Sequence, residues 1–371
     1  MLRFAFAGSS DFVLPILNSV YLHQGQNLSD IAQTQAKNLP LSLLPEQFAE
    51  VWVQIPSNFW TLPLLNQKYE IGFVITQPAS DLRGKIIPNM VETWSKEHKL
   101  DIFTPVKLSN EVDFLKSQRL DLGIVASFGQ ILSVDTLKTP SFGWVNWHPS
   151  KLPKYRGPTP MQSFLATGQN ETALSWIEMG QKMDAGGMLL QINQHVDIKT
   201  DIAALAVQMG NLGASTWAIA ACLQLYQQTY PQYQFSIDQE EVDVTFCKML
   251  HKEDRNVNIL ELSAFEIYNH FRAYRNFPGT VFQTKHFKQE AKILEIDLDY
   301  LDKQSLEYKM PIEELLQNSG ILEPKTVFNE FFKQKNQVFL ICKDQTLLPI
   351  KSIQLLENNQ KVILSGYNFK G

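Results

Sequence analysis

The stretch LDLGIVASFGQILSVDTLKTPSFGWVNWHPS, Leu120–Ser150, holds two mostly apolar runs, residues 120–128 and 143–150. Neither run shows the regular alternation of a strand with one wet face, so both are typical of strands buried on both sides. Strands of this kind belong to parallel sheets that helices cover on both faces. The stretch therefore predicts the centre of an α/β domain.

The chain upstream continues this pattern, with short apolar runs separated by amphipathic stretches. The expected strands are residues 2–8, 69–76 and 101–106, and the expected helices are residues 10–22, 91–99 and 111–118. This alternation predicts a Rossmann-like, mostly parallel sheet. Such sheets bind ligands beyond the carboxyl ends of their strands.

The length of 371 residues predicts two domains, because one domain usually holds roughly 100–200 residues. We expect an N-terminal α/β catalytic domain over 1–230, with an insertion at about 22–66, a linker at 231–240 and a second domain over 241–371. Residues 171–179 and 186–196 are strand-like, and 201–228 predict one long helix. The second domain is expected to be a small OB-like β-barrel, from strand-like runs at 279–287, 291–296, 337–344, 347–356 and 361–367.

Composition excludes several classes of protein. A net charge of −5 and a pI near 5.9 argue against indiscriminate binding to polyanions, although residues 244–292 hold eight Lys or Arg against five acids and so carry +3. The start of the chain has no signal-peptide pattern and no apolar run reaches about 18 residues, which predicts a cytoplasmic protein. The three cysteines lack metal-ligand spacing and are expected to be buried, so we expect no metal.

Three polar residues carry the candidate chemistry. Asn146 and His148 are two apart on an expected strand, so both side chains point to one face. Asp184 precedes Ala-Gly-Gly, a permissive turn that can bring its carboxylate close to other groups. A carboxylate beside an imidazole holds its tautomer, and an Asn amide can donate to an oxyanion, which together suit acyl transfer.

Other chemistries lack their motifs. The chain has no G-x-S-x-G and no phosphate-binding P-loop, and Gly8 is the single glycine where a dinucleotide fold would show three. We therefore expect the acyl acceptor itself to attack. The alternative is that Asn146 and His148 only satisfy backbone groups, but the rigid Pro-rich loop after them favours a ligand clamp.

The segments NWHPSKLPKYRGPTPMQ (146–162) and EMGQKMDAGGML (178–189) resemble the signatures of 10-formyltetrahydrofolate-dependent formyltransferases. Within that family, FAGSSDF (6–12), TQPASDLRGK (76–85) and VTFCKMLHKED (244–254) together with FRAYRNFPGTVF (271–282) resemble the methionyl-tRNA formyltransferases. The resemblance covers nearly the whole chain outside the insertion. It departs at Lys151, Trp147, Ala185 and Gly187, where family members usually carry other residues.

The resemblance implies transfer of a formyl group from 10-formyltetrahydrofolate to the α-amino group of methionyl-initiator tRNA, without a metal. We expect a monomer with no membrane partner, although the sequence does not determine the oligomeric state. It implies catalytic roles for Asn146, His148 and Asp184. The implied folate contacts are Ala126, Gly129, Gly143, Pro149, Ser150, Lys151, Leu152 and Pro153. The implied tRNA contacts are Arg83, Lys85, Arg156, Lys248, Lys252, Arg272 and Arg275.

Three alternatives use the same residues. A sugar N-formyltransferase and a formyltetrahydrofolate hydrolase would both use the Asn, His and Asp, with a sugar amine or water as acceptor. A non-enzymatic relative would bind folate or tRNA with an idle site. The role of the insertion at 22–66 is not predictable from these motifs.

Overall fold

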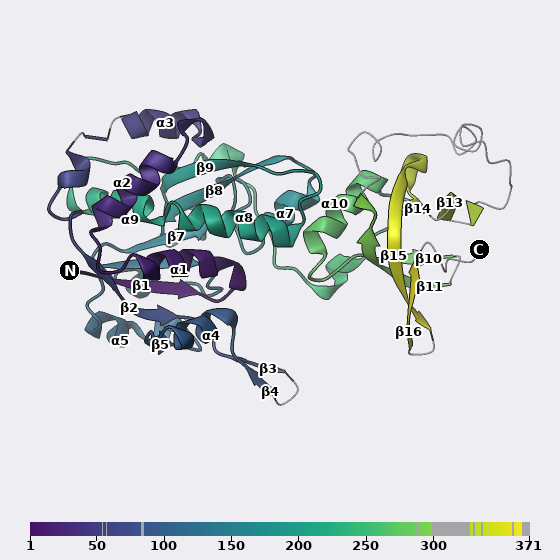
Figure 1. Ribbon diagram of the computed structural model, residues 1–371, viewed down its shortest axis with the longest axis horizontal. Coiled ribbons are helices and arrows are strands. Elements are labelled where there is room, and N and C mark those ends of the chain that lie inside the picture. The colour runs from purple at the N-terminus through teal and green to yellow at the C-terminus, as the bar shows by residue number, and fades with distance from the viewer. Residues whose placement is uncertain are drawn as a thin grey trace. The chain divides into compact units, whose positions relative to one another are not determined.

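The computed structural model describes residues 1–53, 55–56, 58–82, 85–285, 288–298, 327–328, 331–334, 337–357 and 360–365. The chain divides into two compact units (Figure 1). The first unit comprises Met1–Pro160, Glu171–His195 and Ala206–Lys248, and the second comprises Met161–Asn170, Val196–Leu205 and Met249–Gly371.

The first unit is built on a sheet of seven strands in the order β5-β2-β1-β6-β7-β8-β9. The five strands from β5 to β7 are parallel, and β8 and β9 are antiparallel additions at the β7 side. The strands are β1 (Leu2–Gly8), β2 (Tyr69–Ile75), β5 (Ile102–Phe103), β6 (Leu122–Ala126), β7 (Trp144–His148), β8 (Glu171–Glu178) and β9 (Met188–His195). The predicted mostly parallel sheet is thus confirmed.

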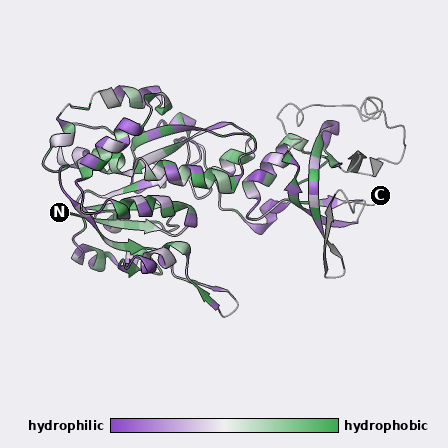
Figure 2. Cartoon of the chain, viewed as in Figure 1, coloured by the Kyte–Doolittle hydropathy of each residue, from purple (hydrophilic) through white to green (hydrophobic). Residues whose placement is uncertain are grey.

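Helices cover both faces of this sheet, as the alternation of strand and helix requires. The helices of the first unit are α1 (Leu14–Leu22), α2 (Leu28–Asn38), α3 (Glu46–Val53), α4 (Met90–Glu97), α5 (Val112–Ser117), α6 (Val134–Leu137), most of α8 (Ile202–Ala214) and α9 (Trp217–Thr229). Helix α7 (Pro160–Ala166) lies almost wholly in the second unit. On one face Ala5 packs in a cluster with Leu115 of α5. On the other face Phe4 stacks on Tyr69, whose ring meets Trp217 of α9. Figure 2 shows green, hydrophobic stretches on the central strands.

The segment predicted as an insertion folds into α2 and α3 and packs on the first unit. The side-chain amide of Gln35 in α2 donates to the carbonyl of Ala214 at 3.2 Å and accepts from the amide of Ala218 at 3.0 Å. The ring of Phe59 lies 4.9 Å from that of Tyr226 in α9. The insertion therefore covers α9.

One predicted long helix, residues 201–228, is two helices. The break falls at Ser215 and Thr216, where the Thr216 hydroxyl donates to the carbonyl of Leu212 at 2.7 Å and accepts from the Trp176 indole at 3.0 Å. Thr side chains that bond the carbonyl four residues back compete with the helix ladder. The prediction missed this because the apolar period continues across the break.

The second unit carries an antiparallel sheet in the order β10-β11-β15-β14-β13-β12, with β16 paired to β15. Its elements are α10 (Ala264–Tyr274), β10 (Val281–Thr284), β11 (Gln289–Ile296), β12 (Val327–Phe328), β13 (Phe331–Gln334), β14 (Gln337–Ile341), β15 (Leu347–Glu357) and β16 (Gln360–Ser365). Ile350 of β15 pairs with both β11 and β14, while Leu355 pairs with both β11 and β16. One edge of β15 is therefore shared by β14 and β16, as in a sheet that curls toward a half-barrel.

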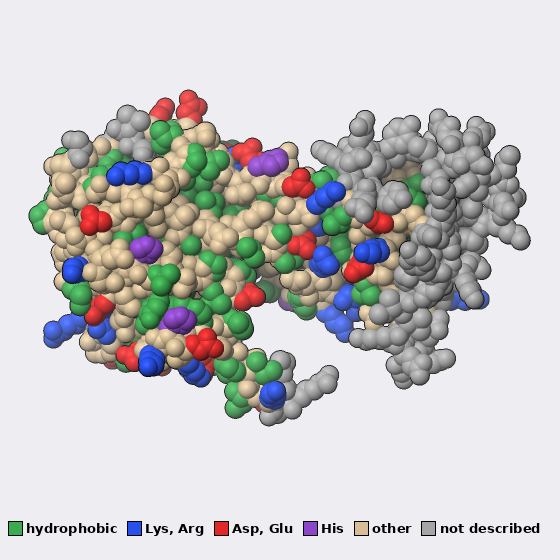
Figure 3. Space-filling model, in the orientation of Figure 1, with side chains coloured by type: hydrophobic (Ala, Val, Ile, Leu, Met, Phe, Trp, Pro, Cys, Tyr) green, Lys and Arg blue, Asp and Glu red, His purple; other side chains and the backbone are tan. Residues whose placement is uncertain are grey.

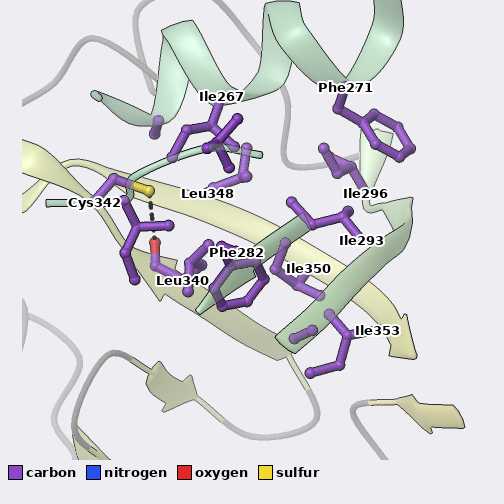
Figure 4. Close-up of a cluster of buried hydrophobic side chains, with 14 of the residues drawn as sticks. Ile267, Phe271, Phe282, Ile293, Ile296, Leu340, Cys342, Leu348, Ile350 and Ile353 are labelled. Carbon is purple, nitrogen blue, oxygen red and sulfur yellow. Dashed lines mark hydrogen bonds between the residues drawn. The ribbon is translucent and has the colours of Figure 1, made fainter. Parts of the chain in front are cut away.

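Apolar side chains of α10 and this sheet form the core of the second unit, which confirms the predicted antiparallel β-domain (Figure 4). Phe271 of α10, Phe282 and Ile293 are each 5% exposed or less. Cys342 joins this core, and its thiol contacts the carbonyl of Leu340 at 3.5 Å. Positions 286–287 and 366–367, at the ends of two predicted strands, lie outside the described residues. No helix among the described residues is long and apolar enough to cross a membrane.

Candidate active site

Strand β7 places Asn146 and His148 on one face of the first sheet. Trp144, two residues earlier on the same face, packs in the core cluster around α5, and its indole donates to the Thr136 carbonyl at 3.0 Å. On the opposite face Trp147 is buried and donates to the Met209 carbonyl at 3.3 Å. The strand is thus fixed on both sides, and Asn146 and His148, 9% and 4% exposed, have little freedom.

Asp184 reaches this pair from the turn between β8 and β9. It has a φ of 51°, which few residues other than glycine adopt without strain. Its Oδ1 accepts from Nδ2 of Asn146 at 3.3 Å, and its Oδ2 accepts from the amide of Gly157 at 2.8 Å. Nδ1 of His148 lies 3.6 Å from the same Oδ2. One carboxylate therefore contacts both strand residues.

The partners of His148 fix the orientation of its ring. Nε2 lies 3.0 Å from the carbonyl oxygen of Tyr155. A carbonyl oxygen can only accept, so Nε2 carries a proton in this arrangement. Nδ1 is then the nitrogen that can take up and release a proton, and the Asp184 carboxylate beside it can balance the positive charge that results.

The loop that supplies Tyr155 and Gly157 is held by a second segment, Thr245–Cys247. The amide of Tyr155 donates to Oγ1 of Thr245 at 2.8 Å, and that of Arg156 donates to the Thr245 carbonyl at 2.9 Å. The Cys247 amide donates to the Arg156 carbonyl at 2.8 Å. Burial raises the pKa of the Cys247 thiol, which favours the neutral form in this contact.

Gly157 is required by the close approach of these two segments. Its φ of 123° lies outside the range that residues with a Cβ readily adopt. A Cβ there would run into the carbonyl oxygen of Cys247 and lie 3.0 Å from its sulfur. The glycine thus allows its own amide to reach Asp184.

The cluster can move a proton and stabilise an oxyanion. An Asn amide has two N–H groups, and Asp184 engages one of them, so the other can donate to a developing negative charge. Nδ1 of His148 supplies acid–base chemistry beside it. Among the described residues, no group of three or more His, Cys, Asp or Glu could hold a metal ion.

Comparisons with known proteins decide the class of this site. A family model described as formyl transferase matches residues 64–219. The methionyl-tRNA formyltransferase of Staphylococcus epidermidis is 31% identical over 225 residues, which cover 58% of this chain and 69% of the relative. The chain belongs to the formyl transferase family. The methionyl-tRNA formyltransferase of Mycoplasmopsis pulmonis is 32% identical to this formyltransferase over 217 residues, which cover 58% of this chain and 73% of the relative.

A solved structure agrees with the fold of this formyltransferase. The N-formyltransferase from Helicobacter canadensis, in complex with folinic acid and dTDP-3-aminofucose, superposes with a TM-score of 0.52. The match covers 94% of this chain and 98% of that chain at 13% sequence identity. At this identity the likeness concerns the fold.

The residues predicted to contact folate fall in two places. Around His148, Ser150 and Leu152 are buried, and the Ser150 hydroxyl donates to the Lys154 carbonyl at 2.8 Å. Lys151 is half exposed and pairs with Glu171 at 3.0 Å. The others near the carboxyl ends of β6 and β7 are Ala126 and Pro149, which are buried, Pro153, which is partly buried, and Gly129, which is exposed.

Gly143 does not belong to this group. It precedes Trp144 at the amino end of β7, whereas His148 ends the strand. At about 3.3 Å per residue, five residues separate the two by roughly 16 Å. The strand predicted over residues 143–150 already placed Gly143 at its start and His148 near its end, and the structure keeps Gly143 away from the site.

The residues predicted to contact tRNA also divide. Lys85, Lys248 and Lys252 are exposed, and Arg83 lies outside the described residues. The Arg275 side chain, 46% exposed, pairs with Asp201 at 2.9 Å.

Arg156 and Arg272 are buried and are not surface contacts. The Arg156 side chain is 4% exposed, its Nε donates to Gln239 at 2.9 Å and its terminal nitrogens lie 3.4 Å from Glu241. Arg272 is 2% exposed and donates to Asn269 and to three backbone carbonyls between residues 197 and 200. A guanidinium with such partners is engaged within the fold, which sequence alone does not reveal.

Sequence reasoning missed Gln239, Thr245 and Cys247 as parts of the site. They follow the interval predicted as a linker or lie within it, and two of the three act through backbone groups. Ile237, in the same interval, pairs with Met188 of β9 through two backbone hydrogen bonds of 2.8 and 2.9 Å. The one sequence signal for this segment was the resemblance of VTFCKML (244–250) to the family, and it did not show that Thr245 and Cys247 contact the loop at Tyr155–Gly157.

Proposed function

We propose that this formyltransferase transfers the formyl group of 10-formyltetrahydrofolate to the α-amino group of methionyl-initiator tRNA. The observation that supports this acceptor is the 31% identity to a methionyl-tRNA formyltransferase over 69% of that relative's length. The solved N-formyltransferase with a sugar nucleotide is only 13% identical, so its ligand has no such weight for this chain.

In the proposed reaction the neutral α-amino nitrogen attacks the formyl carbon, since such amines have a pKa near 8 and are partly neutral at pH 7. A carbon–nitrogen bond forms, and the carbonyl oxygen becomes an oxyanion to which Asn146 Nδ2 donates. Nδ1 of His148 takes the proton that the amine loses and returns it to N10 of the folate as the carbon–N10 bond breaks. Asp184 stabilises the imidazolium in between.

The folate donor is assigned to the loop that follows His148. Pro149, Ser150, Leu152 and Pro153 are the residues we assign to this contact, with Ala126 and Gly129 beside them. The Ser150–Leu152 backbone is braced by Ser175, whose hydroxyl donates to the Ser150 carbonyl at 2.7 Å. A braced loop positions a ligand with little loss of conformational entropy.

The tRNA is assigned to exposed basic residues on each unit. On the first unit, the hairpin of β3 (Ser80–Leu82) and β4 (Lys85–Ile87) carries Lys85 beside the 75%-exposed Ile86. Figure 3 shows hydrophobic and basic side chains together on this hairpin. Such a pair can contact an unstacked base and a phosphate. On the second unit we assign Lys252 and Arg275 to the tRNA.

The test is a parallel assay with three acceptor conditions. Labelled 10-formyltetrahydrofolate is mixed with the enzyme and methionyl-initiator tRNA, with a nucleotide-linked amino sugar, or with no acceptor. We expect label on methionyl-tRNA. Label on the sugar alone would identify a sugar N-formyltransferase, and formate released without acceptor would identify a hydrolase.

A further inference from the structure

Gln239 connects the two halves of the candidate site. Its Nε2 donates to the carbonyls of Asp184 at 2.7 Å and Gly186 at 2.8 Å, and its Oε1 accepts from Nε of Arg156 at 2.9 Å. Carbonyls only accept and Nε of Arg only donates, so these partners determine which end of the amide is which. Both N–H groups and the oxygen of the Gln239 amide thus have partners in the site's own loops.

The bonds of Gln239 close a ring around Asp184. The Asp184 carboxylate accepts from the Gly157 amide, and the residue before Gly157 is Arg156. Arg156 donates to Gln239, and Gln239 donates back to the Asp184 backbone. Asp184 is therefore held at its carboxylate by the Gly157 amide and at its backbone carbonyl by Gln239.

Asp184 needs such support because its backbone is strained. A non-glycine residue at a φ of 51° costs on the order of 1–3 kcal/mol and persists only where its surroundings hold it. The turn from Gln181 to Met183 is exposed and gives no packing support. Two hydrogen bonds from one amide, on either side of Ala185, fix this turn where the carboxylate contacts His148.

We propose that Gln239, backed by the buried Arg156, is a positioning residue that sets the place of the Asp184 carboxylate and through it the protonation chemistry of His148. The inference rests on formyl transfer at this site and not on which acceptor is used. Arg156 is accordingly a fixed internal cation whose exposed partner Glu241 balances its charge.

The experiment is a double-mutant cycle with Gln239→Leu and Asp184→Ala in the full chain. If Gln239 acts through Asp184, Gln239→Leu lowers kcat roughly 10- to 100-fold in the wild-type background, with KM values within about twofold. In the Asp184→Ala background it changes kcat less than about twofold. Equal losses in the two backgrounds, or an unchanged kcat in the first, would overturn the proposal.

The matched control is Gln224→Leu. Gln224 is 2% exposed and donates to the Phe142 carbonyl at 2.9 Å, at the amino end of β7. Its loss removes a buried hydrogen bond of the same kind, so the melting temperature is expected to fall while kcat stays within about twofold. A kcat loss matching that of Gln239→Leu would mean that both act through stability.

A second readout needs no activity. Hydrogen exchange without substrates is followed on peptides that contain the Gly157 amide, which donates to Asp184. Exchange there is expected to be faster in Gln239→Leu than in wild type or Gln224→Leu, and equal protection in all three would contradict the proposal. If the wild type formylates another acceptor, the proposed function fails, while the cycle run with that acceptor and the exchange data still decide the role of Gln239.

Discussion

Gly157→Ala tests the packing that builds the site, because the structure allows no Cβ at this position. The methyl group would meet the Cys247 carbonyl in a backbone conformation with a φ of 123°. Backbone strain of about 1–3 kcal/mol and overpacking of about 1–3 kcal/mol add to a loss of roughly 2–6 kcal/mol in the free energy of unfolding. At about 2–4 °C per kcal/mol for a domain of roughly 150–250 residues, the melting temperature should fall by roughly 4–24 °C.

Activity should fall further than stability explains. To relieve the contact, the loop must move away from Thr245–Cys247. This movement displaces the Gly157 amide from Asp184 and the Tyr155 carbonyl from His148. A displacement of about 1 Å at reacting groups can cost on the order of 10²-fold in rate. We expect that loss in kcat at a temperature where circular dichroism shows the variant folded.

The control for this substitution is Gly25→Ala. Gly25 has a φ of 83°, and a Cβ there would meet nothing within 4 Å. It should show backbone strain alone, about 1–3 kcal/mol, with wild-type kcat. Equal melting temperatures and equal kcat values for the two alanine variants would refute the claim that the loop is fixed by its contact with Cys247.

Three further predictions follow from other residues. His148→Ala should lower kcat at least ~10²-fold, and near-normal turnover would remove the ring from acid–base catalysis. Lys252→Ala should raise KM for tRNA and reduce its salt dependence, whereas Lys37→Ala on the exposed side of α2 should do neither, as initial rates at several salt concentrations would show. His270, whose pKa is lowered by burial, binds fewer protons in the folded state, so its contribution to stability is present above the ordinary pKa near 6.5 and is lost as the pH falls below it. Between pH 5 and 7, the free energy of unfolding measured with denaturant should therefore rise less with pH for His270→Asn than for wild type. The control is the exposed-site variant His195→Asn, which should behave as wild type. An equal rise in all three proteins would contradict this.

The sequence predicted the sheet well because burial on both faces leaves a clear apolar pattern. It predicted the strand at 101–106 as too long, since β5 ends at Phe103 and Pro105 lacks the N–H that a ladder needs. Helix α10 has a capping box, with Ser263 and Glu266 bonding each other's backbone groups, and that spacing could have predicted its start.

Asn146, His148 and Asp184 were predicted to meet, and the structure brings them together. What the sequence could not show was how they are held. Gln239 acts on backbone carbonyls 53 and 55 residues away. Such contacts leave no local pattern, because any turn offers carbonyl oxygens and only the fold decides which donor reaches them.

The buried arginines illustrate the same limit. Arg156 and Arg272 are cationic, as residues that bind the phosphates of a nucleic acid usually are. The sequence alone does not distinguish them from the exposed Lys252. Only the positions of Gln239, Glu241 and the carbonyls near Thr200 show that their guanidinium groups are already engaged. A cationic residue can be assigned to a nucleic-acid-binding surface only once the burial of its side chain is known.

The most direct measurement is the initial rate at which label passes from formyl-labelled 10-formyltetrahydrofolate to methionyl-initiator tRNA, with wild type and His148→Ala side by side. The account predicts label on the α-amino group of methionine with wild type and a loss of at least ~10²-fold with the variant. No label on methionyl-tRNA with folded wild type, or equal rates for the two proteins, would contradict it.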